Sequence, residues 1–487
     1  MYCTRMASAP PPPAVAQERW DARVWGALVL LCGVLFLDGL DVSMVGVALP
    51  SIGKDLNLST SQLQWIVSGY VLGYGGLLLL GGRVADLLGR RRVLIIGLSV
   101  FTVASVLGGL VSDPTLLLAT RFLKGASAAF TAPAGLSIIT TTFAEGPVRN
   151  RALSIYTACG ASGFSFGLIL GGLMTEVGWR STFLLPVPFA LAILIAAPRL
   201  LRADPPAERS WRGFDLAGAV TITATMLALV RTVVRAPDVG WGDPETIIGF
   251  VAAVALAALF VGIERRSAEP LVRLGILRSG HIVRANVGAM AMAGCYFGFQ
   301  FVATLYLQSV LGWSPLETAL AFLPAGLIVA FGSPRIGGLA GRFGLPRLVA
   351  LGFIAFAAGY ALYLRVVDTS PDYVLVILPT MLLLGAGFAL CFPTLNMMAT
   401  TGIADHEQGL AAGLVQTSFQ VGGAVVLAVV SAVVSGTAVS EADAGGFLTV
   451  MRESVGVVTA VAVLGLLVAL SALVPARRTE PALATNS

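Results

Sequence analysis

Two carboxylates, Asp38 and Asp41, interrupt an otherwise apolar run of the sequence over residues 24–50. Residues three apart share one face of a helix, so the two acids are expected to be neighbours. A carboxylate at the centre of a membrane span costs about 2.5–3.5 kcal/mol, which makes a functional role the favoured interpretation. Burial and mutual repulsion favour a bound proton on at least one of them near neutral pH. We therefore interpret the pair as a proton-binding site; the alternative is that both acids simply face a water-filled cavity.

Two cations, Arg121 and Lys124, interrupt a second apolar run over residues 116–142. Arg121 lies near one end of its run, and Asp41 lies nine residues from the corresponding end of its own run, a depth of roughly 14 Å. A long arginine side chain can reach that depth, so an ion pair between them is one interpretation. The other interpretation is that the Arg121 side chain extends outwards to the membrane surface. Lys124, one turn further along, is placed to pair with the same acids.

The amino-acid composition indicates the environment in which these charged residues lie. Of 487 residues, 56% are hydrophobic and only 12% are charged, with a mean hydropathy of +0.87. Because soluble domains carry about 25% charged residues, these values exclude a soluble multidomain enzyme, a disordered protein and a disulfide scaffold. A membrane span needs about 20 apolar residues. The sequence predicts an all-α polytopic membrane protein with 14 transmembrane helices, at 24–50, 62–81, 93–112, 116–142, 153–174, 181–198, 214–234, 245–263, 285–309, 316–334, 348–366, 374–398, 409–436 and 454–474.

Lysine and arginine are distributed unevenly between the two sides of these runs. With the N-terminus inside, 23 of the 31 basic residues fall in the inner tails and loops, six fall on the outer side and two lie within a span. By the positive-inside rule, this predicts a multi-pass protein of the inner (cytoplasmic) cell membrane with both termini in the cytoplasm. The net charge of +5 is then explained without a nucleic-acid partner.

The chain partly repeats itself. Residues 81–92 (GGRVADLLGRRR) match residues 336–347 (IGGLAGRFGLPR) at an offset of 255, and Ser59 matches Ser314 at the same offset. Parallel halves of this kind are typical of transporters, whose substrate site lies between the halves near the bilayer midplane. The predicted organisation is a disordered tail (1–23), a six-helix bundle (24–198), a linker with two extra helices (199–279), a second helical bundle (280–474) and a short tail (475–487).

The loop around residues 82–92 combines glycines with charges. Gly82 and Gly89 permit tight turns and close helix approach, while Asp86, Arg90 and Arg91 can form charge-assisted bonds between helix ends. Positive-inside topology explains the arginines but neither Asp86 nor the glycines. The second copy has Gly341 in place of Asp86, so a charged latch in this loop would be asymmetric.

Two further sets of residues lie inside the spans. Gly163, Gly167 and Gly171 form two overlapping GxxxG spacings, which serve either ordinary close packing or a conformational hinge. Polar and aromatic residues are expected to line a cavity for large lipophilic or cationic ligands. They are Tyr70, Tyr296, Gln300, Asn396, Gln416 and Gln420.

Taken together, the motifs of this sequence resemble those of the major facilitator superfamily, and within it the fourteen-helix drug:proton antiporter family. Leu40-Asp41 through Pro50 resembles the first-helix motif, and GRVADLLGRRR from Gly82 resembles the superfamily loop motif. Arg121 with Gly125 resembles the fourth-helix motif, with Lys124 where a glutamine is usual. The glycines of 163–171 resemble the antiporter motif, with Gly167-Leu168 where Gly-Pro is usual. The segment from Phe214 to Gly218 resembles the start of the inserted helix pair.

The resemblance implies that Asp41 and Arg121 couple transport to protons and that the 82–92 loop is a cytoplasmic gate. The expected function is proton-driven export of small hydrophobic or cationic drugs by a monomer in the lipid bilayer. No cofactor beyond the proton gradient is expected, because the sequence has neither a GxxxxGK[ST] nor an HExxH motif and no Cys/His cluster. Two alternatives stay open. One is a dedicated exporter of a single antibiotic, siderophore or lipid; the other is a membrane sensor or scaffold, which could lose Asp41 and Arg121 without penalty.

Overall fold

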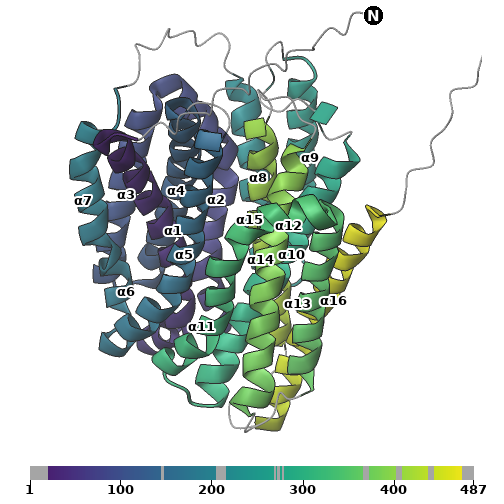
Figure 1. Ribbon diagram of the computed structural model, residues 1–487. Coiled ribbons are helices and arrows are strands. Elements are labelled where there is room, and N and C mark those ends of the chain that lie inside the picture. Colours follow the sequence, from purple (N-terminus) through teal and green to yellow (C-terminus); the bar gives the residue numbers. More distant parts are fainter. Residues whose placement is uncertain are drawn as a thin grey trace, which may run out of the picture.

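The computed structural model describes residues 20–143, 147–203, 215–267, 270, 275–276, 279–365, 372–401, 408–436 and 444–473. These residues form helices and short connections, and no β-strand occurs among them (Figure 1). The predicted all-helical class is therefore confirmed. Most of the predicted tail 1–23, the whole of 475–487 and part of the linker 199–279 lie outside the described residues.

The first part of the bundle is built around α1 and α4. The Asp21 carboxylate accepts a hydrogen bond from Val24 N at 2.7 Å and starts α1, and Asn57 in the left-handed conformation ends it. α1 packs along α5, while α4 packs along α2 and α3. The helices are α1 (Ala22–Leu56), α2 (Thr60–Leu88), α3 (Arg90–Leu110), α4 (Pro114–Thr142), α5 (Pro147–Val177), α6 (Arg180–Leu184) and α7 (Pro186–Leu200).

The second part follows a helical hairpin formed by α8 (Leu216–Val239) and α9 (Pro244–Glu264). In this part, α10 packs against α15 and α16, and α13 packs against α14 and α16. The elements are α10 (Gly280–Leu305), η3 (Tyr306–Val310), α11 (Pro315–Gly332), η4 (Ser333–Arg335), α12 (Ile336–Phe343), α13 (Leu345–Leu364), η5 (Tyr373–Ile377), α14 (Leu378–Thr400), α15 (Gln408–Gly436) and α16 (Ala444–Ser471).

Thirteen helical stretches within the described residues are long and apolar enough to cross a membrane. The remaining predicted span corresponds to α8, whose apolar stretch Ala217–Val233 is shorter. The total of fourteen spans therefore stays a prediction, whereas the multi-pass character of the chain is clear.

Positions that match at the 255-residue offset have the same local structure. Ser59 and Gln62 form a capping box at the start of α2, and Ser314 with Glu317 forms one at the start of α11. Gly89 and Gly344 both have positive φ, 95° and 81°, where each connects two helices. A side chain with a Cβ would be strained at both connections, which explains the glycines of the two loops.

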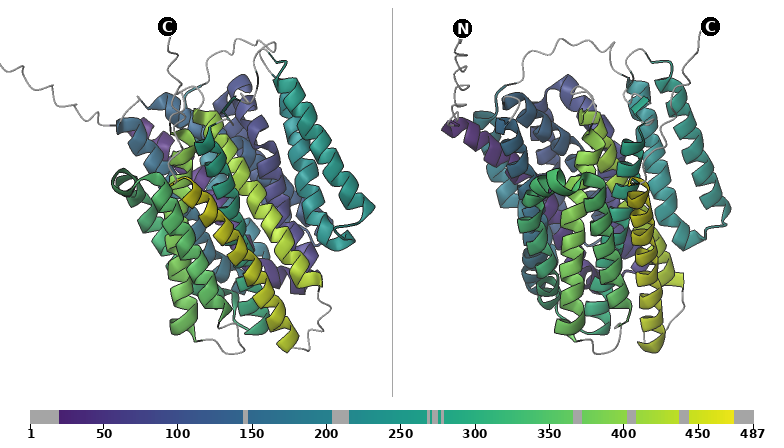
Figure 2. Two further views of the ribbon diagram at one scale, coloured as in Figure 1. Left: turned by 90° about the vertical axis from the view of Figure 1, so that its right-hand side faces the viewer. Right: turned by 45° about the vertical axis from the view of Figure 1, so that its right-hand side comes forward.

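The two parts of the bundle meet along two seams. On one seam α5 packs against α11, and Ser165 Oγ donates a hydrogen bond to Gly326 O at 3.0 Å. On the other seam α2 packs against α15, and α8 contacts both of these helices. Figure 2 shows the α8–α9 hairpin in teal at the side of the bundle. The hairpin thus covers the α2–α15 seam rather than forming a separate unit.

Candidate functional site

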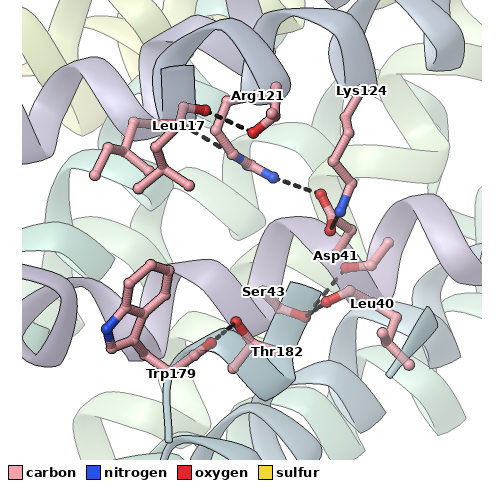
Figure 3. A network of polar contacts seen from close by, with 11 residues as sticks. Leu40, Asp41, Ser43, Leu117, Arg121, Lys124, Trp179 and Thr182 are labelled. Carbon is pink, nitrogen blue, oxygen red and sulfur yellow. Dashed lines mark hydrogen bonds and ion pairs between the residues drawn. The ribbon is translucent and has the colours of Figure 1, made fainter. Parts of the chain in front are cut away.

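Asp41 is enclosed between two cations from α4. Its side chain has no solvent exposure, and Arg121 Nη1 donates to Asp41 Oδ2 at 2.5 Å. Lys124 Nζ bonds the other carboxylate oxygen, and the lysine is also fully buried. Figure 3 shows both cations directed at the same carboxylate. Of the two interpretations of Arg121, the structure has the ion pair, and both oxygens of Asp41 are used.

A second bond fixes the orientation of Arg121. Its Nε donates to the backbone oxygen of Ile66 on α2 at 3.1 Å. The guanidinium therefore joins α4 to both α1 and α2. Breaking a buried ion pair by removing one partner costs about 3–5 kcal/mol, so this group is expected to hold the three helices together.

Aromatic rings enclose the two cations. The guanidinium of Arg121 lies 5.0 Å from the ring centre of Tyr70, and Lys124 Nζ lies 4.7 Å from Phe101 and 5.2 Å from Phe183. These rings come from α2, α3 and α6. A cation above an aromatic face gains up to about 2 kcal/mol when desolvated. The rings thus offset part of the cost of burying charge.

Asp38 is placed differently from Asp41. It is 8% exposed, and its Oδ2 atom is buried without a hydrogen-bond partner among the described residues. It lies one turn before Asp41 on the same helix, α1. The two acids are thus neighbours, as their spacing predicts, but only Asp41 is paired with the cations.

The three glycines of α5 bring it against α1. A Cβ at Gly163 would overlap Phe36 O, one at Gly167 would overlap the Leu40 backbone, and one at Gly171 would lie 2.7 Å from Met44 Cα. The contacts fall on the turns of α1 that carry Asp38 and Asp41. In this structure the glycines therefore set the packing that positions α1, and a hinge role stays a prediction.

The residues of the 82–92 loop that are described bond within the first part of the bundle. Arg90 Nη1 donates to Ser137 O on α4 at 3.3 Å, and Arg91 Nη2 donates to Pro198 O on α7 at 2.8 Å. Gly89 supplies the turn between α2 and α3, and Gly82 lies near Pro133. The side chain of Asp86 lies outside the described residues.

The residues predicted to line one cavity lie on α2, α10, α14 and α15. Tyr296 and Gln300 line a small cavity of about 10 Å³ together with Leu168 and Phe322. Tyr70 lies instead at the Arg121 guanidinium. Asn396 Nδ2 donates to Phe392 O of its own helix at 2.8 Å.

The two predicted glutamines lie on α15. Gln420 opposes Gly75 where α15 crosses α2. Gln416 is half-buried, with a buried amide oxygen that has no hydrogen-bond partner among the described residues. A common cavity lined by all six residues stays a prediction.

An aromatic cluster between the two parts of the bundle was missed by the sequence analysis. Tyr296 contacts Phe164 of α5 and Phe388 of α14, with ring centres 6.0 and 4.9 Å away. Phe297 contacts Phe419 of α15 at 5.6 Å. The i, i+4 spacing of Phe388 and Phe392 was the available signal, since it places two rings on one helix face. Among the described residues, no three His, Cys, Asp or Glu side chains gather into a metal-binding group.

A two-part bundle of helices that are long and apolar enough to cross a membrane defines a multi-pass membrane protein. The sequence model described as Major Facilitator Superfamily matches residues 31–427, and the chain belongs to that superfamily. The family expected from the sequence motifs is confirmed.

Similar proteins of known role export antibiotics or resist them. The puromycin resistance protein pur8 of Streptomyces alboniger is 38% identical over 99% of this chain and 97% of that protein. The cephamycin export protein CmcT of Amycolatopsis lactamdurans is 37% identical over 86% of each. The multidrug resistance protein Stp of Mycobacterium tuberculosis (strain CDC 1551 / Oshkosh) is 32% identical over 82% of this chain and 74% of that protein.

Solved structures share the fold. The POT family transporter PepTSo aligns with a TM-score of 0.68 at 17% identity, over 93% of this chain and 99% of that one. The nucleoside transporter NupG aligns with a TM-score of 0.66 at 12% identity, over 91% and 99%.

Proposed function

We propose that this transporter is a proton-coupled antiporter that exports small hydrophobic or cationic drugs across the cytoplasmic membrane by alternating access. The observation that carries the proposal is the fully buried Asp41 held by Arg121 and Lys124. Ionisable residues inside a membrane span mark proton relays and ion pathways. Both termini would lie in the cytoplasm, and a monomer suffices because one chain supplies the whole site.

Proton binding at Asp41 would change the charge of the site. A proton on the carboxylate removes the attraction for Arg121 and Lys124, and leaves two buried cations with no ionised partner at Asp41. Their charge then repels a cationic drug in the space between the two halves. Because proton loading and drug binding oppose each other, one ligand leaves as the other arrives, which is the requirement for exchange. Asp38, with its unpartnered buried oxygen, is a second acceptor for the proton.

The aromatic cluster supports the ligand class. Tyr296 and Phe297 of α10 contact rings from α5, α14 and α15, so aromatic faces from both halves converge. Such faces bind lipophilic and cationic groups. Arg90 and Arg91 fasten the loop to α4 and α7, so in this mechanism the first half moves as one body.

A second candidate is a dedicated exporter of one antibiotic. The observation in its favour is that pur8, which matches this chain over nearly the full length of both, is named for resistance to a single antibiotic. A transporter of that kind would use the same proton site but would reject most dyes.

The test is ethidium accumulation in energised cells that express the wild type, Asp41→Asn or Asp55→Asn. Asp55 is a suitable control because it lies on the same helix, but half-exposed and paired with Arg180. We expect the wild type and Asp55→Asn to lower accumulation, and Asp41→Asn or an uncoupler to abolish the effect. Wild-type protein that reaches the membrane but moves no dye would overturn multidrug export. Export of only a single antibiotic from a panel would then favour the dedicated exporter. The absence of any export would favour a sensor or scaffold.

A further inference from the structure

A separate cavity of about 290 Å³ lies between α2, α4 and the α8–α9 hairpin, away from the aromatic cluster. One wall is apolar and is formed by Leu58, Trp65, Ile66 and Leu118. The other wall carries the guanidiniums of Arg231 and Arg235 from the last turns of α8. The cavity is thus apolar on one side and cationic on the other.

The two arginines retain bonding capacity. Arg231 Nη2 and Arg235 Nε lie 3.3 and 2.9 Å from the same oxygen, Oε1 of Glu245 on α9. Their side chains are 62% and 45% exposed. A guanidinium has five N–H donors, so one shared carboxylate oxygen leaves most of them for another acceptor. An anion is the ligand that this wall fits.

The position of the hairpin in the bundle suggests the source of the anion. Figure 2 shows the turn between α8 and α9 ending short of the lower ends of the green and yellow helices, α14 and α16. α9 exposes Ile248, Val251 and Val254, each more than 60% accessible, as a lipid-facing helix does. Trp241 at the turn is 46% exposed, and tryptophan is enriched at the depth of lipid headgroups. These features are typical of a helix that contacts lipid near the headgroups, so a lipid phosphate is the anion that best fits the cationic wall.

We propose that this cavity binds one phospholipid with an anionic headgroup. The phosphate lies against Arg231 and Arg235, and the start of an acyl chain follows the apolar wall at Trp65 and Ile66. Small-molecule pockets have volumes of about 300–1,000 Å³. A cavity of 290 Å³ takes the headgroup and leaves most of both chains in the bilayer. A soluble anion would use the arginines but would leave the apolar wall without a partner.

The site adjoins the ion pair. Ile66, which lines the cavity, accepts the hydrogen bond from Arg121 Nε, and Leu118 packs at the same turn of α4. A lipid in the cavity therefore contacts the residue whose backbone orients Arg121. The inference itself concerns binding only and stands independently of the proposed export.

The experiment is native mass spectrometry of the full-length protein after incubation in micelles with equal amounts of phosphatidylglycerol and phosphatidylcholine. We expect the wild type to retain phosphatidylglycerol preferentially. In the double variant Arg231→Gln/Arg235→Gln the preference should fall roughly 10- to 30-fold, as expected for two arginine charges at an anionic surface. Arg365→Gln, which removes an exposed arginine at the end of α13, is the matched control and should retain the wild-type ratio.

Two further arms make the assignment specific. Thr115→Trp places a large ring in the cavity without changing charge, and it should also lose the bound lipid. Excess inorganic phosphate should not displace phosphatidylglycerol from the wild type. Equal retention of the two lipids, an unchanged ratio in the double variant or Thr115→Trp, or displacement by phosphate would overturn the proposal. Monodisperse elution and an unchanged melting temperature establish that each variant is folded.

Discussion

Arg121 on α4 and Asp41 on α1 form a 2.5 Å ion pair between side chains that are 80 residues apart and almost fully buried. Two further bonds support this pair. Lys124 bonds the second oxygen of the same carboxylate, and Ile66 O accepts a hydrogen bond from Arg121 Nε. Arg121 thus joins α4 to both α1 and α2.

Substitution of Lys124 by glutamine is expected to shift the pH dependence of export. Two cations stabilise ionised Asp41, so removing one makes the carboxylate bind its proton at a less acidic pH. The pH profile of dye export should move upwards by about one pH unit or more. Lys54→Gln is the control, because Lys54 is an exposed residue near the end of α1. An identical profile for both variants would show that Lys124 does not act on the proton site.

Substitution of Arg121 is expected to lower stability in proportion to the bonds lost. Arg121→Gln loses the charge and should destabilise the protein in detergent by about 3 kcal/mol, the lower end for a broken buried pair. Arg121→Lys retains the charge but lacks the planar fork that serves Asp41 and Ile66 together, so an intermediate loss is expected. The measurement is the melting temperature of each variant. If the lysine variant equals the wild type, the bond to Ile66 contributes nothing.

A methyl group at Gly167 is expected to disturb the α1–α5 contact. The added Cβ would overlap the backbone of Leu40, so α5 must move away from α1 at the turn before Asp41. We expect Gly167→Ala to cost about 1–3 kcal/mol, as overpacked cores do. Gly262→Ala on α9 is the control, since nothing lies within 4 Å of the added Cβ. Equal melting temperatures for the two variants would contradict the close packing.

Loss of an aromatic ring from the cluster is expected to weaken drug binding without removing proton coupling. Phe388 contacts both Tyr296 and Phe392, with ring centres 4.9 and 5.4 Å away. Phe388→Ala should raise the ethidium concentration for half-maximal export roughly three- to tenfold. Phe331→Ala, at a residue that is 66% exposed, should have no effect. A fall in the maximal rate alone would place Phe388 outside the drug site.

Much of the fold could be predicted because membrane spans are local features of a sequence. About 20 consecutive apolar residues define a span wherever they occur, and the capping boxes at Ser59 and Ser314 involve residues only three apart. At α8, the described apolar stretch Ala217–Val233 contains Arg231 and is shorter than the other spans. The candidate acids and cations were also identifiable, since charge within an apolar run is visible without a structure.

The sequence by itself determined the membrane class, most of the helices and the choice of Asp41, Asp38, Arg121 and Lys124 as candidates. Tertiary structure decided that Asp41 takes both cations while Asp38 takes neither. It also assembled an aromatic cluster from α5, α10, α14 and α15, and set the hairpin on the α2–α15 seam. The physical reason is that helical periodicity fixes which face a residue occupies. The partner of that face depends on how distant helices pack against one another.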